Sequence, residues 1–88
     1  MTESGLGQSS LPVPHSVLEG GGENASILLT AIARGMDGLP CGKVLEVVSL
    51  VPQVQADVIV WCHVNGNELI ALLRNDEQTR FWIRKHES

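Results

Sequence analysis

The sequence predicts one small α+β domain, in which strands and helices share a single hydrophobic core. Its 88 residues are 43% hydrophobic and 18% charged, which is enough for one core but leaves too little chain for a second. Apolar residues recur at helical spacing over 25–36. Runs rich in β-branched and aromatic residues over 43–50 and 79–84 are typical of strands.

Charge and cysteine content narrow the classes of function. Six Lys and Arg against ten Asp and Glu give a net charge of −4, which disfavours binding to a nucleic-acid backbone. The apolar runs are far shorter than the ~20 residues that span a bilayer, and the N-terminus does not resemble a signal peptide. Two cysteines do not make the disulfide framework of a small secreted domain. We therefore expect a cytoplasmic protein with free thiols and no cofactor, which binds neither nucleic acid nor membrane.

The N-terminal residues predict a tail followed by a strand. Residues 1–15 are rich in Ser, Gly and Pro and show no period, so we expect a flexible tail and a folded domain over 16–86. The short apolar run from His15 to Leu18 predicts the first strand. Glu19 and the three glycines at 20–22 then indicate the end of that strand and a tight loop.

A helix, a loop and a second strand follow. The side chain of Asn24 or of Ser26 can accept a hydrogen bond from a free amide at the start of a helix over 25–36. Residues 37–42 contain two glycines and a proline, which indicates a loop. The β-branched residues beyond it predict a buried strand over 43–50.

Residues 52–65 allow two interpretations. Their β-branched and aromatic content, followed by Asn65-Gly66, predicts the first strand of a hairpin. Pro52 near a helix start, apolar residues at helical spacing and Gly66 as a helix-ending residue predict a helix instead. Periodicity alone does not decide between them.

The C-terminal part is simpler to interpret. It predicts a strand over 68–73, a polar turn over 75–78 and a final strand over 79–84. The final strand and its flanks carry a stripe of basic residues, namely Arg74, Arg80, Arg84 and Lys85. Such a stripe is explained either by solvated charges along an edge strand or by the docking of an acidic partner.

Residues 18–85 resemble the TusA/SirA-type family of small sulfur carriers in one gapless register. The opening motif of the family falls on Leu18, Glu19, Gly22, Ala25, Ser26 and Leu28, and its helix-to-strand turn on Cys41, Gly42, Leu45 and Val47. The pattern of its second helix falls on Pro52, Asp57, Val58, Trp61, Cys62 and Gly66. The start of the strand that follows this helix in the family falls on Gly66, Asn67, Glu68 and Leu69. The C-terminal motif of the family falls on Phe81, Ile83, Arg84 and Lys85. The resemblance implies a helix at 53–65. It also implies a two-layer β-α-β-α-β-β sandwich, with two helices on one face of a four-stranded mixed sheet.

The same resemblance places the sulfur-carrying thiol of the family at a position where this chain has Ala25. A methyl group forms no thiolate and carries no persulfide, and the two motif prolines are replaced by Ser26 and Leu28. Cys41 is expected at the far end of the first helix, roughly 18 Å away. Cys62 matches a packed position of the second helix, so we expect a small core residue there.

The resemblance and the loop composition together indicate a non-catalytic module that binds a protein, and the resemblance makes a protein of sulfur metabolism one candidate partner. The candidate surface residues are Glu19, Gly22, Glu23, Asn24, Ser26, Arg80 and Arg84. No metal site is expected, because His63 beside Cys62 has no second ligand pair at suitable spacing. Two alternatives stay open: an active sulfurtransferase that uses Cys41, and a small regulatory domain unrelated to sulfur.

Overall fold

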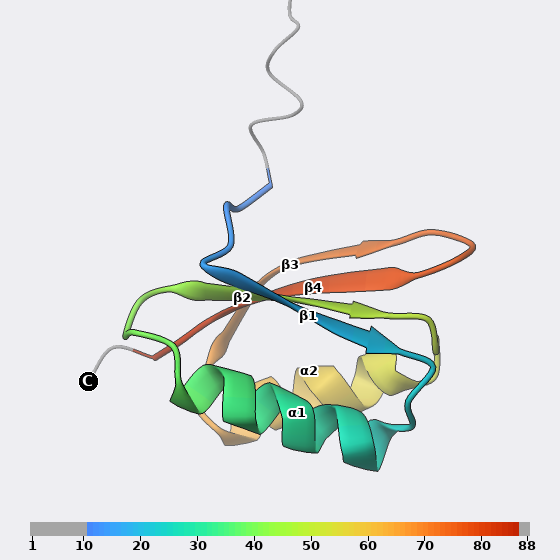
Figure 1. The fold of residues 1–88 in the computed structure, drawn as a ribbon, viewed down its shortest axis with the longest axis horizontal. Coiled ribbons are helices and arrows are strands. Elements are labelled where there is room, and N and C mark those ends of the chain that lie inside the picture. Colours follow the sequence, from blue (N-terminus) through green and yellow to red (C-terminus); the bar gives the residue numbers. More distant parts are fainter. Residues whose placement is uncertain (1–10, 87–88) are drawn as a thin grey trace, which may run out of the picture.

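The computed structural model describes residues 11–86, which form four strands and two helices (Figure 1). In chain order the elements are β1 (Ser16–Gly21), α1 (Ala25–Asp37), β2 (Val44–Ser49), α2 (Val54–Val64), β3 (Glu68–Arg74) and β4 (Thr79–Arg84). The strands form one mixed sheet, and both helices cover the same face of it (Figure 1). The predicted two-layer α+β sandwich is therefore confirmed.

The strand order of the sheet is β1-β2-β4-β3. β1 and β2 are parallel, and β4 runs antiparallel to both of its neighbours. β4 is therefore a central strand, and β1 and β3 are the edges. The interpretation of the basic stripe as charges along an edge strand is wrong, because the β3–β4 hairpin folds back so that β4 pairs with β2.

The hydrophobic core lies between the helices and the sheet. Alternate residues of β2 and β4 point toward the helices, as the two-residue period of a strand requires. They meet the residues that recur at helical spacing on α1 and α2. The core members with the least exposed surface are Leu28, Ile32, Leu45, Val47, Val54, Val58, Cys62, Phe81 and Ile83.

β1 extends further toward α1 than the sequence predicted, so the loop between them is shorter. β1 continues through Gly20 to Gly21, where we expected the glycines to end it, and Gly21 pairs with Ser49 beyond a bulge. A Cβ atom on Gly20 would lie 2.6 Å from Cδ1 of Leu28 and 2.9 Å from the carbonyl oxygen of Val48. Glycine is therefore needed at position 20 because α1 crosses close over the strand.

α2 is a helix, so the prediction from the family resemblance is confirmed and the local hairpin interpretation is wrong. The helix ends in a Schellman motif, in which Asn67 N–H donates to the Cys62 carbonyl and Gly66 N–H donates to the His63 carbonyl. Gly66 has φ +72°, the left-handed conformation that this motif needs. Burial of the Val54, Val58 and Cys62 side chains outweighs the preference of β-branched residues for strands.

The predicted N-terminal tail falls mostly on residues 1–10, which lie outside the described part. His15 N–H donates to the Val44 carbonyl oxygen over 2.7 Å, one residue before β1 begins. From there, residues 11–14 lead away from the sheet on the side opposite the helices (Figure 1). Neither α1 nor α2 has the length and apolar character that a bilayer crossing requires.

Candidate functional site

Three loops meet at the end of the domain where α1 begins. Leu50 N–H donates to the Gly21 carbonyl oxygen over 2.9 Å, which joins the loop after β2 to the loop after β1. Thr79 pairs with Ser49 on one side and with Arg74 on the other, so the β3–β4 turn lies at the same end. We call this surface the α1 end. It consists of residues 19–27, 50–57 and 74–78.

α1 begins with an N-cap residue, Asn24, followed by the methyl side chain of Ala25. Asn24 is the N-cap, and its Oδ1 accepts a hydrogen bond from Ile27 N–H over 3.0 Å. Of the two residues that the sequence offered as the N-cap of this helix, Asn24 is therefore the cap. Ser26 lies within the first turn of α1 and is exposed. Ala25 is half-buried against the core. The position at which the family resemblance would place a thiol therefore offers only a methyl group.

Neither cysteine supplies a reactive thiol at Ala25. Cys41 is exposed in the loop beyond α1, a helix of 13 residues, which at 1.5 Å per residue separates the two positions by about 20 Å. Cys62 is buried, and burial raises the pKa of its thiol from 9.0 to about 11. The Cys62 thiol therefore stays protonated at neutral pH and has little nucleophilic character.

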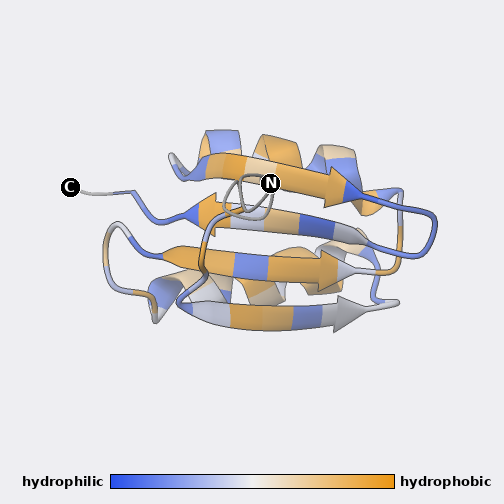
Figure 2. Ribbon diagram, turned by 90° about the horizontal axis from the view of Figure 1, so that it is seen from above, coloured by the Kyte–Doolittle hydropathy of each residue, from blue (hydrophilic) through white to orange (hydrophobic). Residues whose placement is uncertain are grey.

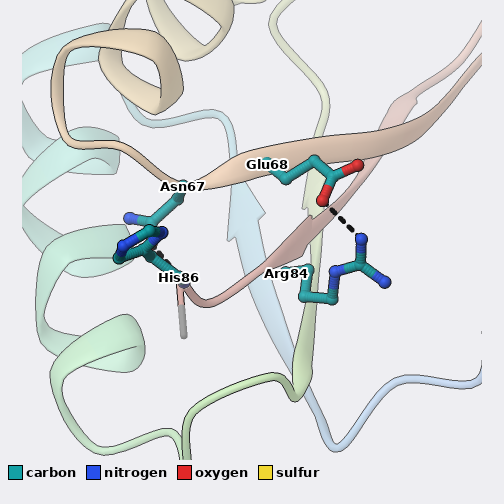
Figure 3. A network of polar contacts seen from close by, with 4 residues as sticks. All are labelled: Asn67, Glu68, Arg84 and His86. Atoms are coloured by element: carbon teal, nitrogen blue, oxygen red, sulfur yellow. Dashed lines mark hydrogen bonds and ion pairs between the residues drawn. The ribbon is translucent and has the colours of Figure 1, made fainter. Parts of the chain in front are cut away.

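The structure separates the predicted surface residues into two groups. Glu19, Gly22, Glu23, Asn24 and Ser26 are all exposed at the α1 end. Arg84 lies at the opposite end of the sheet, where it forms an ion pair with Glu68 (Figure 3). Next to that pair, His86 N–H donates to Oδ1 of Asn67 over 3.0 Å.

Arg80 lies on the outer face of the sheet, between the two groups. Its Nε donates to Oε2 of Glu46 over 2.9 Å, and its Cζ lies 4.9 Å from the centre of the Trp82 ring. Among residues 11–86, Glu46 is the one charged residue that is buried, at 7% exposure. The ion pair and the ring hold the Arg80 guanidinium against the sheet, so its first role is structural.

The other cations of the predicted stripe also have acceptors. Lys85 Nζ donates to the carbonyl oxygens of Asp37 and Leu39 over 3.3 and 2.8 Å, which caps the C-terminal end of α1. Arg74 Nη1 donates to Oε1 of Gln55 over 3.3 Å. The four basic residues therefore do not form a continuous positive surface for an acidic partner.

Sequence reasoning missed the apolar part of the α1 end. Ile27 is 52% exposed on the first turn of α1, and Leu50 is 55% exposed directly after β2. A hollow of about 210 Å³ lies beside Leu50, and its lining includes Asp76 and Glu77 from the β3–β4 turn. The sequence offered no direct signal for this hollow, because its residues come from loops that only the strand order brings together.

Charge is distributed unevenly along the domain. The acidic residues at the α1 end are Glu19, Glu23, Asp57, Asp76 and Glu77, and Arg74 is the cation there within the described chain. The opposite end carries four cations, Arg34, Lys43, Arg84 and Lys85, and two carboxylates, Asp37 and Glu68. A charged partner therefore meets two chemically different ends.

Metal binding receives no geometric support within residues 11–86, where no three side chains of His, Cys, Asp or Glu gather closely enough to hold an ion. His63 is exposed, whereas the neighbouring Cys62 is buried. The two side chains therefore point in different directions, as adjacent residues on a helix do.

Comparison of the sequence with protein-family models and with curated proteins gave no match. The fold and the surface define the class of protein as a small two-layer α+β domain with an acidic, partly apolar end. The likeness to TusA/SirA-type carriers stays a prediction from the sequence motifs.

Proposed function

We propose that the chain is a non-catalytic protein-binding module, related to TusA/SirA-type carriers, that engages its partner through the α1 end. One observation carries the proposal. Around Ala25, where carrier chemistry needs a thiol, exposed Ile27 and Leu50 lie among exposed carboxylates. This end is thus suited to contact and lacks the reactive group.

The composition of the α1 end defines the chemistry of the partner. Protein interfaces place apolar side chains at the centre and polar side chains at the rim. The hollow beside Leu50 is lined by two carboxylates, Asp76 and Glu77, and one cation, Arg74, so its net negative charge favours a lysine or arginine side chain of the partner. The partner therefore presents a basic patch around an apolar contact. By the family resemblance, a cysteine desulfurase or another protein of sulfur metabolism is the first candidate.

Capture of partners from a lysate by the full-length chain tests the surface. Leu50→Lys places a cation in the acidic surface, so proteins captured by the wild type should be lost. Val64→Lys is the matched control, because Val64 is 73% exposed at the other end of α2. Loss of the same proteins with Val64→Lys, or their retention with Leu50→Lys, would contradict the proposal. Circular dichroism of each variant checks that the fold is intact.

The relocated-thiol alternative has one supporting observation, the exposure of Cys41. Incubation with a cysteine desulfurase and radiolabelled cysteine distinguishes the two functions. We expect no label on the protein. Label that disappears in Cys41→Ala would establish the alternative and remove the non-catalytic part of the proposal.

A further inference from the structure

Trp82 is buried on the face of the sheet that neither α1 nor α2 covers. Alternation along β4 turns Phe81 toward the helices and Trp82 to the outer face, yet only 1% of Trp82 is exposed. The Arg80 guanidinium covers part of the ring, with its Cζ 4.9 Å from the ring centre. An indole has far more surface than one guanidinium plane can cover. Another part of the chain therefore lies over Trp82.

Residues 11–14 are on this side of the sheet, and we call them the strap. They rise from the start of β1 across β2 toward β4, over the outer face (Figures 1 and 2). Pro12 and Pro14 are half-buried, whereas Val13 between them is 89% exposed. The two prolines therefore face the sheet, and the strap is the segment that closes over Trp82.

The strap is held by apolar contacts. His15 N–H donates to the Val44 carbonyl oxygen and joins the chain to the sheet just before β1. Beyond this bond, no backbone hydrogen bond links residues 11–14 to the rest of the chain that the structure describes. Each proline restricts the residue before it to an extended conformation and has no N–H of its own to pair. The strap is thus an extended segment that can leave the outer face without breaking a backbone hydrogen bond.

The indole N–H of Trp82 has no acceptor beneath the strap. Among the side-chain nitrogen and oxygen atoms that are buried within residues 11–86, Trp82 Nε1 is the one without a hydrogen-bond partner. A buried tryptophan N–H usually finds an acceptor, because an unpaired donor loses its bonds to water without replacement. The strap therefore fills the space over the ring but leaves its polar group unsatisfied.

We infer that Trp82 is the floor of a binding site for an extended, proline-containing segment of a partner protein, and that the strap is the internal occupant which this segment displaces. Proline-rich segments commonly dock on surfaces lined by aromatic side chains. Their backbone carbonyl groups make no internal hydrogen bonds, so one of them is free to accept from Trp82 Nε1. A partner segment that supplies this acceptor gains a hydrogen bond that the strap does not make.

The charges around Trp82 define the segment further. Arg80 is paired with Glu46, and Arg84 is paired with Glu68. These charged groups on the outer face satisfy one another, so the site favours an uncharged segment of the same apolar, proline-containing chemistry as the strap. The site shares no residue with the α1 end and is independent of the function proposed for that end.

The accessibility of Trp82 in the full-length chain measures opening of the strap. In a Trp61→Phe background Trp82 is the one remaining tryptophan. Acrylamide quenching of its fluorescence should rise severalfold in Pro12→Asp, which places a charge on the half-buried side of the strap. Val13→Asp is the matched control and should be quenched like the wild type. Equal quenching in the two variants would overturn the role of the strap, and circular dichroism verifies that each variant is folded.

A peptide with the sequence of the strap tests the binding site. The probe is Leu-Pro-Val-Pro-His, the sequence of residues 11–15, blocked at both ends and titrated into the full-length chain by calorimetry. Pro12→Asp should bind the probe at least about tenfold more tightly than the wild type, because the internal occupant no longer competes. A peptide with glycine at both proline positions should bind more weakly, since it is not preorganised. Absence of binding to Pro12→Asp, or equal affinity for the two peptides, would overturn the inference.

The indole N–H signal of Trp82 tests the hydrogen bond. Trp61→Phe identifies which of the two indole signals in nitrogen–proton correlation NMR spectra belongs to Trp82. This signal should move downfield when the probe saturates Pro12→Asp, and a signal that does not move would contradict the proposed acceptor. Leu50→Lys should leave binding of the probe unchanged, so failure of the α1 end as an interface is seen separately. A wild-type dimer that is lost in Pro12→Asp would assign the site to the strap of a second copy and overturn its assignment to a partner.

Discussion

Arg80 stacks on Trp82, with its Cζ 4.9 Å from the ring centre, while its Nε donates to Glu46. The three side chains occupy the middle of the outer sheet face, the face that neither α1 nor α2 covers (Figure 2). Trp82 is nevertheless only 1% exposed, and the Arg80 guanidinium covers part of its ring. The Arg80–Glu46 ion pair and the Trp82 ring therefore cover the middle of the outer face, where α1 and α2 do not lie.

Removal of the Glu46 carboxylate should destabilise the domain. Glu46→Ala leaves the Arg80 guanidinium, whose side chain is 32% exposed, without its ionic acceptor. We expect the free energy of unfolding to fall by about 1 to 3 kcal/mol, measured by urea denaturation. The control is Glu68→Ala in the exposed pair with Arg84, where a loss of less than about 1 kcal/mol is expected. Equal losses in the two variants would argue against a structural role for the buried pair.

A methyl group at position 20 should disturb the approach of α1 to β1. In Gly20→Ala the new Cβ meets Leu28 and the carbonyl oxygen of Val48, and the backbone atom cannot turn away. We expect a loss of about 1 to 3 kcal/mol in unfolding free energy. Gly22→Ala is the matched control, because nothing lies within 4 Å of its added Cβ. Its effect should stay within about 0.5 kcal/mol.

Stability should fall at high pH because of Cys62. Burial raises the pKa of this thiol to about 11 in the folded chain, whereas in the unfolded chain it ionises near 9.0. Ionisation therefore favours the unfolded state. The contribution is fully present below pH 9 and is lost as the pH rises toward 11. Urea denaturation across this range should show a shallower decline for Cys62→Ala. An unchanged slope would mean that other groups cause the decline.

A thiol placed at the start of α1 should be a reactive cysteine. In Ala25→Cys the positive end of the α1 dipole favours the thiolate, so its pKa should lie below that of an ordinary exposed thiol. The rate of alkylation by iodoacetamide against pH, in a Cys41→Ser background, measures this pKa. Cys41 of the wild type is the reference, since it is exposed and distant from the helix start. A midpoint at or above that of Cys41 would show that partial burial at position 25 outweighs the dipole.

Most elements of the fold could be predicted from the residues themselves. Helical spacing gave α1, and β-branched content gave β2 and β4 to within a residue or two. α2 needed the family resemblance, because Asn65-Gly66 suits a hairpin turn as well as a helix end. The choice between them depends on core contacts of Val58 that local sequence does not contain.

The candidate site was predicted only where it is continuous in the sequence. Glu19 and Ser26 are near each other because few residues separate them. The arrival of Leu50 and Asp76 at the same end depends on the order of the strands, which propensity does not encode. The pairing of Arg80 with Glu46, 34 residues apart, depends on the same order.

The position of β4 also bears on how the chain reaches its native state. β4 follows every other element in the sequence, yet β2 and β3 are connected through it. During synthesis these two strands have no common neighbour until Thr79–Arg84 leave the ribosome. Phe81 and Ile83 then enter the core together with the last hydrogen bonds of the sheet. A chain that lacked residues 79–84 would keep β1 paired with β2 but leave β3 without a partner strand, so only contacts through the helices would link the two parts.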